Sequence, residues 1–178
     1  MKSVIFLDTE TTGLKQEEGH RIIEIALVRY DIATRELIDS FIQRIDPDRA
    51  IDPRAQEVHG ICYEDLAGCP KWEEVAGNVS EFIQRGDLLV IQNASFDMPF
   101  IENELRRVGV EMSKTAPQFC TKENGRWACA DGKFPNLQEL CFALGVEYDK
   151  AKAHGASYDT EILAECFFRG FDRGFFKY

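Results

Sequence analysis

The sequence has 178 residues, enough for one domain with a full-sized core, and its 44% hydrophobic content excludes a disordered chain. Its apolar runs all fall well short of the ~20 residues that span a bilayer, and the first ends in an acid rather than at a cleavage site, so we expect a cytoplasmic protein with no membrane segment. The net charge of −10 excludes a generic nucleic-acid binder, because affinity for phosphate comes mainly from Lys and Arg.

The N-terminal part of the chain predicts three strands. Residues 3–8 are typical of a buried strand, with the apolar run Val4–Leu7 at their centre, and "RIIEIALVRYD" from Arg21 and "ELIDSFIQRID" from Glu36 alternate as strands do. Short links between successive strands favour an antiparallel meander. A Pro-rich loop then leads into a short helical segment before Gly60.

The remainder predicts helices with one more strand between them. Apolar residues recur at helical spacing over 72–83, and we expect Gly86 to end that helix. "DLLVIQN" (87–93) is a short strand, and Gly109 closes the helix that follows it.

The C-terminal third holds two further helices. Residues 111–135 show no clear periodicity, whereas Asn136 and Glu139 form the capping box of a helix, and a last helix covers 156–169. The whole pattern predicts a single α/β domain over residues 1–178, with a mixed sheet and helices on its faces.

Asp8 and Glu10 stand where the first apolar run ends. Side chains two apart on an extended chain point to the same side, so both carboxylates project together and repel each other. Hard oxygen ligands of this kind suit Mg²⁺ or Mn²⁺. A solvated turn that carries two surface acids is the alternative.

Asp97 follows the next apolar strand, at the entry to a helix. An acid in a first helical turn is common without any further role, because it interacts favourably with the helix dipole. Considered alone, Asp97 is best explained in that way.

Asp159 lies on the apolar stripe of the last predicted helix, with Ile162, Leu163 and Cys166. An acid on a core-facing stripe costs several kcal/mol unless it is paired or bound to a metal. His154 precedes it by five residues, and a histidine held beside an acid is a candidate for proton transfer.

Together these segments resemble a known family, the DnaQ-like (DEDDh) 3′–5′ exonucleases. "FLDTETTGL", "IQNASFD" and "HGASYDTEILAE" match its three exonuclease motifs, and "RIIEIALV", "VHGI" and "NLQELC" match the segments between them. A sister branch has Tyr four residues before the last Asp, whereas here Gly155 stands there and His154 precedes it, as in the histidine branch. The resemblance covers nearly the whole chain and is strongest to the proofreading subunits of bacterial replicative polymerases. It implies a ribonuclease H-like fold, with a mixed five-stranded sheet (an antiparallel meander plus parallel strands) flanked by helices.

The resemblance also implies a role for individual residues. Asp8, Glu10, Asp97 and Asp159 would bind two divalent cations, Mg²⁺ or Mn²⁺, and His154 would be the general base, which makes these five the catalytic residues. A second group would hold the terminal nucleotide, with turn chemistry and packing as the alternative: Thr11, Thr12, Gly13, Leu14, His59, Asn93 and Phe96. In that group Gly13 would permit close backbone approach, Leu14 would wedge against the base, and Phe96 would stack on it.

Two features depart from the family pattern. In "FCTKENGRWACADGKFPN" (119–136), Lys122, Arg126 and Lys133 cluster with Trp127 between them. Such a segment either tracks a single nucleic-acid strand or is a solvated loop, and the loop is favoured slightly. The sequence also stops at Tyr178, where the proofreading subunits continue into a polymerase-binding tail, so a polymerase or another protein partner is left open.

Six cysteines are present, and none forms a CxxC pair. The three histidines are not spaced as zinc partners either. Reduced thiols are therefore favoured over a zinc site or a disulfide.

We therefore expect a metal-dependent 3′–5′ exonuclease that releases nucleoside 5′-monophosphates from single-stranded or frayed DNA. An RNA-directed exoribonuclease is the alternative within the class, because the motifs read phosphate and sugar rather than a base. A catalytically silent nucleic-acid-binding subunit and a phosphatase of small phosphates are the alternatives from other classes. The presence of all five catalytic positions argues against the silent subunit. The sequence does not decide between a monomer and a homodimer.

Overall fold

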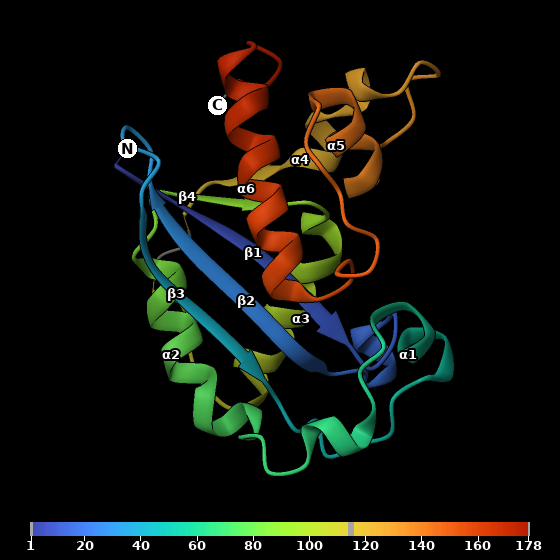
Figure 1. Cartoon of the computed structure of the whole chain (residues 1–178). Helices are drawn as coiled ribbons and strands as arrows, with labels where there is room; N and C mark the ends of the chain where they lie inside the picture. Colours follow the sequence, from blue (N-terminus) through green and yellow to red (C-terminus); the bar gives the residue numbers. More distant parts are fainter. Residues whose placement is uncertain (1, 114–115, 178) are drawn as a thin grey trace.

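The computed structural model describes residues 2–113 and 116–177, and in that part a mixed sheet lies between two layers of helices (Figure 1). The sheet has the order β3-β2-β1-β4-β5. Its strands are β1 (Ser3–Thr11), β2 (Ile22–Asp31), β3 (Leu37–Arg44), β4 (Leu88–Ile91) and β5 (Gln118–Cys120). The first three pair antiparallel, whereas β4 pairs parallel with β1 and β5 parallel with β4. The predicted mixed five-stranded sheet and its meander are thus confirmed.

The helices follow the predicted pattern closely. They are α1 (Pro53–His59), α2 (Trp72–Gln84), α3 (Ala94–Arg107), α4 (Thr121–Asn124), α5 (Leu137–Leu144) and α6 (Ala156–Asp172), with 3-10 turns at Gln16–Glu18, Tyr63–Leu66 and Arg126–Ala128. The predicted capping box at the start of α5 is present, with Asn136 and Glu139 bonded to each other's backbone. Within the described ranges, none of the helices is both long and apolar enough to cross a membrane.

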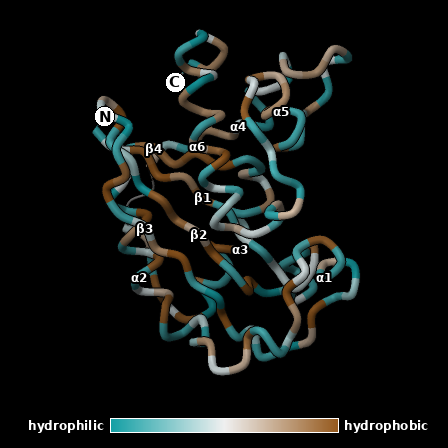
Figure 2. Tube along the Cα trace, viewed as in Figure 1, coloured by the Kyte–Doolittle hydropathy of each residue, from teal (hydrophilic) through white to brown (hydrophobic). Residues whose placement is uncertain are grey.

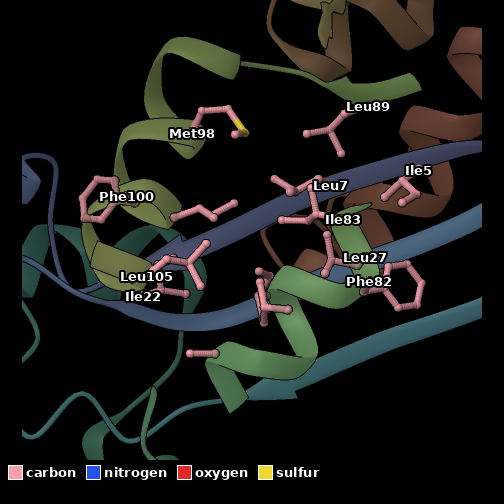
Figure 3. Close-up of a cluster of buried hydrophobic side chains, with 14 of the residues drawn as sticks. Ile5, Leu7, Ile22, Leu27, Phe82, Ile83, Leu89, Met98, Phe100 and Leu105 are labelled. Carbon is pink, nitrogen blue, oxygen red and sulfur yellow. The ribbon is translucent and has the colours of Figure 1, made fainter. Parts of the chain in front are cut away.

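The alternation of β1 divides the core in two. Ile5 and Leu7 pack against α2 and α3, as Figure 3 shows, whereas Val4 and Phe6 pack against α5 and α6 on the other face. Hydrophobic residues concentrate along the central strands, and the outer loops are hydrophilic (Figure 2). The same alternation continues beyond Leu7, so successive side chains at the strand end also face opposite layers.

The first strand is longer than predicted. The sequence predicts an end at Asp8, but the strand continues through Thr11 because Thr9 and Thr11 are buried and pair with Ile25 and Ile22 of β2. Glu10 and Thr11 therefore belong to a strand rather than to the turn after it. The register shifts between these two residues, which bends the strand end.

The unassigned region 111–135 contains the short strand β5. Only three residues form it, with Phe119 and Cys120 buried, so it has too little length to show a period in the sequence. The six cysteines occur as free thiols, and the buried sulfur atoms of Cys141 and Cys166 lie 3.5 Å apart.

Gly86 does not end α2 in the expected way. The C-cap is Arg85, in a right-handed helical conformation, and Gly86 lies outside the left-handed region. The glycine is required for packing instead, because a Cβ at this position would lie 2.6 Å from Cδ1 of the buried Ile5.

Gly86→Ala should therefore lower the free energy of unfolding by about 1–3 kcal/mol, the usual range for overpacking a core. Gly77→Ala is the matched control, because Gly77 lies inside α2 and a Cβ there would meet nothing within 4 Å. It should raise the free energy of unfolding by about 0.5–1 kcal/mol through helix propensity. Urea denaturation measures both changes, and equal effects of the two substitutions would contradict the packing explanation.

Candidate active site

Three carboxylates from two elements meet at the end of β1. Asp8 and Glu10 project from the strand toward α6, and Asp159 projects from the first turn of that helix. Oxygen atoms of the three groups all lie within 4.8 Å of one another. The position of α6 across β1 and β2, visible in Figure 1, brings Asp159 to the strand end.

Asp97 reaches the same strand end from the opposite layer. It lies in the first turn of α3 with 3% of its surface exposed, and its Oδ1 accepts a hydrogen bond of 2.6 Å from Thr9 Oγ1. Thr9 stands between Asp8 and Glu10, so the alternation of β1 turns it toward α3. Sequence reasoning assigned no role to Thr9, although the alternation itself was the available signal.

Burial raises the pKa of every acid in this group, and repulsion between carboxylates adds to the rise at Asp8 and Glu10. Burial is the largest cause for each of them, and repulsion by Asp97 and Glu10 adds to it at Asp8, whose pKa lies well above its usual range. The pKa of Glu10 rises to about 9, and that of Asp97 rises to about 7 although the Thr9 hydrogen bond opposes the rise. The pKa of Asp159 is also raised.

The group fits a divalent cation. Asp159 Oδ1 is buried and accepts no hydrogen bond from the part of the chain that the structure describes, so this oxygen is left for a ligand. Several hard carboxylate oxygens that repel one another are the donor set that Mg²⁺ and Mn²⁺ take.

His154 lies at the exposed entrance to the cluster, just before α6. Its backbone N–H donates to Asp159 Oδ2 at 3.2 Å, and its φ of 61° is a left-handed conformation that few non-glycine residues adopt. The hydrogen bond to Asp159 helps to hold this strained residue in place.

A pocket of about 430 Å³ opens beside Glu10. Five of the seven predicted nucleotide residues line it, namely Thr11, Gly13, Leu14, His59 and Phe96. Leu14 is 79% exposed, as a side chain that wedges against a ligand must be. Phe96 packs against Phe100 with ring centroids 5.1 Å apart, which fixes one wall of the pocket. His59 is half-buried, and burial lowers its pKa.

The other two predicted residues do not line that pocket. Thr12 is fully buried beneath it, and its hydroxyl bonds the His20 ring at 3.1 Å and accepts from the Arg21 N–H at 3.0 Å. Asn93 is the N-cap of α3, and its side chain accepts hydrogen bonds from Ser95 and Lys122 in a neighbouring pocket.

The lack of a side chain at Gly13 allows the ring of His20 to approach the backbone closely. A Cβ at Gly13 would lie 2.2 Å from Cε1 of His20, which also lines the pocket and which sequence reasoning missed. The ring of His20 therefore supports the turn that carries Leu14.

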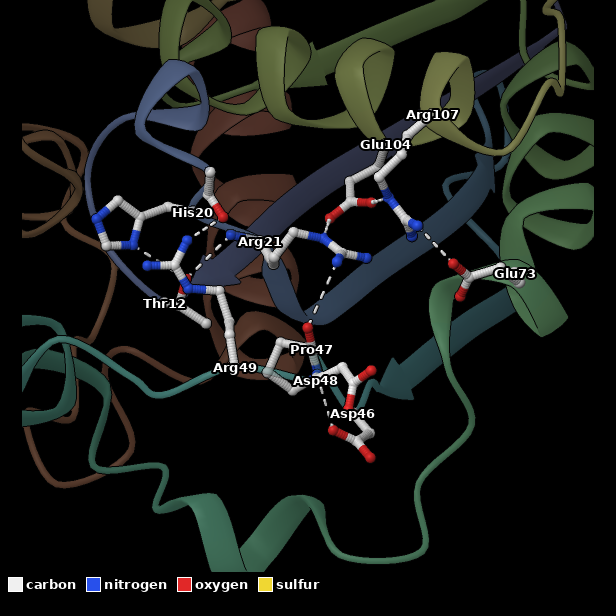
Figure 4. Close-up of polar contacts among 11 residues, drawn as sticks. Thr12, His20, Arg21, Asp46, Pro47, Asp48, Arg49, Glu73, Glu104 and Arg107 are labelled. Atoms are coloured by element: carbon white, nitrogen blue, oxygen red, sulfur yellow. Dashed lines mark hydrogen bonds and ion pairs between the residues drawn. The ribbon is translucent and has the colours of Figure 1, made fainter.

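An ion-pair network centred on the buried Glu104 anchors this turn to α3 (Figure 4). The guanidinium of Arg21 pairs with Glu104, which is 1% exposed and also accepts from Arg107 Nε at 3.0 Å. Arg107 in turn pairs with Glu73 of α2. Because Arg21 also exchanges hydrogen bonds with Thr12, the network ties the turn beside the pocket to α3 and α2.

The basic segment at 119–136 packs against the core, which neither of the two predictions for it, a strand-tracking segment or a solvated loop, includes. Trp127 packs into the core and stacks on Phe175 with centroids 4.4 Å apart, so its ring is not an open platform for a base. Arg126 lies over the Phe134 ring, and Lys133 pairs with Glu139.

A mixed sheet of this order, with carboxylates of its first strand and its last helix meeting at one end, defines a ribonuclease H-like nuclease of the DEDDh class. Residues 5–167 match the family described as Exonuclease. The DNA polymerase III subunit epsilon of Escherichia coli (strain K12) is 40% identical over 172 residues, which cover 92% of this chain and 69% of that protein. The subunit of the same name from Pasteurella multocida (strain Pm70) is 39% identical over 170 residues, which cover 92% and 66%. The chain thus spans about two thirds of the length of these relatives.

Solved structures share the fold at lower identity. Exonuclease I of E. coli in complex with a dA16 oligonucleotide has a TM-score of 0.83 at 19% identity, covering 97% of this chain and 41% of that one. The nuclease domain of 3'hExo, a DEDDh family member bound to rAMP, has a TM-score of 0.76 at 18% identity, covering 97% and 93%. The chain belongs to the Exonuclease family, and it is a 3′–5′ exonuclease of the DnaQ-like type.

The raised carboxylate pKa values predict a pH-dependent stability that divalent cations reverse. Glu10 titrates near 4.5 when unfolded and at about 9 when folded, so between these values the folded state binds more protons than the unfolded state. The free energy of unfolding of the metal-free protein should therefore fall as pH rises through this window. Since a cation binds the ionised carboxylates, Mg²⁺ should raise Tm more at about pH 8.5 than at about pH 5.5.

Thermal unfolding in EDTA and in Mg²⁺ across this pH range measures the effect. It should reach several degrees, because about 1 kcal/mol corresponds to about 2–4 °C at this chain length. Glu10→Gln should flatten the pH dependence in EDTA and weaken the response to Mg²⁺. A metal-free Tm that rises with pH over the window would refute this electrostatic account.

The contact between Gly13 and His20 predicts a compensating pair of substitutions. Gly13→Ala should lower kcat/KM by about 10–100-fold, because a shift of ~1 Å in a substrate-positioning segment costs that much. His20→Ala removes the ring that the new Cβ meets, so the double variant should be more active than Gly13→Ala alone. Steady-state kinetics of the four proteins measure the coupling, and additive losses would mean that the glycine serves another purpose.

Proposed function

We propose that residues 1–178 act as one exonuclease domain that removes nucleotides from the 3′ end of single-stranded or frayed DNA and releases nucleoside 5′-monophosphates. The observation that carries the proposal is the acid cluster beside a pocket of about 430 Å³, with Glu10 common to both. A terminal nucleotide in the pocket would place its phosphate against the carboxylates. The relatives at 40% and 39% identity are subunits of a DNA polymerase, which supports DNA as the substrate and a polymerase as a partner.

The carboxylates would hold two divalent cations, Mg²⁺ or Mn²⁺, with Asp8, Glu10, Asp97 and Asp159 as ligands. When bound, such cations neutralise charge on the phosphoryl oxygens and lower the pKa of a water molecule. Thr9 would orient Asp97 through its hydrogen bond, and His154 would orient Asp159 through its backbone N–H.

His154 would be the general base. Its position at the exposed entrance allows the imidazole to take a proton from the attacking water and return it to solvent. Leu14 and Phe96 would hold the base of the terminal nucleotide between them, and Thr11 and His59 would contact its sugar. Thr12 and Asn93 would act from outside the pocket, by supporting the turn and the start of α3.

RNA is the second candidate substrate. The neighbour 3'hExo is bound to rAMP, so this fold accommodates a ribonucleotide. The difference between the two substrates lies in the 2′-hydroxyl, which the pocket walls near Thr11 and His59 would accept or exclude.

One assay panel tests the proposed function. The protein is incubated with 5′-labelled single-stranded DNA, double-stranded DNA and RNA, in Mg²⁺, Mn²⁺ or EDTA. We expect shortening from the 3′ end, fastest on single-stranded DNA, with no cleavage in EDTA and none by Asp8→Ala. His154→Ala should lose about 10²–10⁴-fold in kcat, as for a general base.

Glu161→Ala is the control, because Glu161 is an exposed acid of the same helix. Full cleavage in EDTA, or wild-type activity of Asp8→Ala, would refute the mechanism. A loss below threefold for His154→Ala would remove that residue from the role of base. Faster cleavage of RNA would favour the exoribonuclease, and no cleavage of any oligonucleotide would favour the silent subunit or the phosphatase.

A further inference from the structure

A further acid, Glu24, is buried beside the carboxylate cluster. It lies on β2 directly opposite Glu10 and is 7% exposed. Residues paired across two antiparallel strands share a face of the sheet, so Glu24 faces α6 as Glu10 does. In the sequence it is the single acid within the apolar run "IIEIALV".

Both carboxylate oxygens of Glu24 already have partners. Oε2 accepts a hydrogen bond of 2.9 Å from Arg44 Nε of β3, and Oε1 accepts one of 2.8 Å from the Ala156 N–H. Asp8, Glu10 and Asp159 form the candidate metal cluster without it. Glu24 is therefore held as a hydrogen-bond acceptor rather than presented as a further ligand.

The bond to Ala156 replaces a missing helix cap. The first N–H groups of an α-helix lack intrahelical acceptors, and a side chain at the N-cap usually supplies one. The N-cap of α6 is Gly155, which has no side chain to do so. Because Ala156 is 0% exposed, water cannot replace the acceptor either.

Ala156 lies between the two predicted catalytic residues of this segment. His154 is two residues before it and Asp159 is three residues after it, and those two are joined by the hydrogen bond from the His154 N–H. The single hydrogen bond from the Ala156 N–H to Glu24 thus fixes the turn that carries both His154 and Asp159.

We propose that Glu24 is a positioning residue that caps α6 from the sheet and thereby sets Asp159 and His154 against Asp8 and Glu10. This inference rests on the proposed function for its effect on catalysis. Arg44 orients the Glu24 carboxylate and offsets its charge, so the chain Arg44–Glu24–Ala156 links the edge strand β3 to the catalytic end of α6.

Glu24→Ala should lower kcat by about 10–100-fold, the range found when groups that orient metal ligands are removed, because it frees the turn that carries Asp159 and His154. KM should stay within threefold, because the nucleotide pocket is lined from β1, the turn after it, α1 and α3, and not from α6. Glu24→Gln retains an oxygen that accepts from the Ala156 N–H, so it should keep kcat within about fivefold of wild type. Gly86→Ala supplies a destabilised control that should keep its kcat, because a Cβ there meets Ile5, whose side chain packs on the face of the sheet opposite α6.

Two measurements on metal-free protein do not depend on activity. In ¹⁵N-resolved NMR spectra, the Ala156 amide proton of wild type and Glu24→Gln should be shifted downfield and exchange slowly, and in Glu24→Ala it should lose both properties. Titration with Mn²⁺, followed by the EPR signal of the free ion, should show an affinity about 10-fold weaker for Glu24→Ala.

The outcomes separate this inference from the proposed function. If the wild type cleaves no oligonucleotide, the proposed function fails, while the NMR and Mn²⁺ measurements still decide the role of Glu24. An unchanged Ala156 amide in Glu24→Ala, equal losses in Glu24→Gln and Glu24→Ala, or a rise in KM with kcat unchanged would each overturn the positioning role.

Discussion

The structure depends on holding four carboxylates together at one end of β1 in spite of their repulsion. Burial already disfavours the charged form of each, and at Asp8 and Glu10 repulsion by neighbouring acids adds to the cost, which is why the pKa values of these two rise so far. Such a group persists only where the rest of the fold fixes its members. Here β1, α3 and α6 fix the four acids, and bound cations would offset their repulsion in the proposed function.

The alternation of β1 is the first feature that holds the four acids in place. Asp8 and Glu10 face one helical layer, and Thr9 between them faces the other, where it bonds Asp97. The second part comes from helix ends, because Asp97 and Asp159 both lie in first helical turns, α3 and α6, where the partial positive charge of the helix dipole favours an anion. The helix dipole that explains Asp97 from the sequence alone therefore also favours its negative charge beside the other carboxylates.

Local patterns were sufficient to predict much of this arrangement. Alternation predicted that Asp8 and Glu10 share a side, the helical stripe predicted that Asp159 is buried, and the capping box predicted the start of α5. What the sequence did not reveal depends on contacts between distant segments. Thr9 meets Asp97 across 88 residues, and Glu24 meets Ala156 across 132 residues.

Two further residues show the same limit. Trp127 lies between basic residues in a segment predicted either to track a nucleic-acid strand or to be a solvated loop, but it stacks on Phe175 because the segment after α6 folds back against it. Gly13 predicted close backbone approach by a ligand, and its missing side chain also makes room for His20. In both cases the residue type predicts a close contact, but its partner, Phe175 or His20, comes from a distant segment or from the local fold and is not evident from the sequence.

The charge distribution now bears on how a polyanion reaches the site. Lys133 and Arg126 of the basic segment are engaged with Glu139 and Phe134, and Lys122 with Asn93, so this segment offers less positive charge than its composition suggests. In the proposed function, the carboxylate cluster would repel phosphate until cations neutralise it. Substrate affinity and cation occupancy would then be coupled through the same four acids, and the attraction of this chain of net charge −10 for nucleic acid would come from the bound ions.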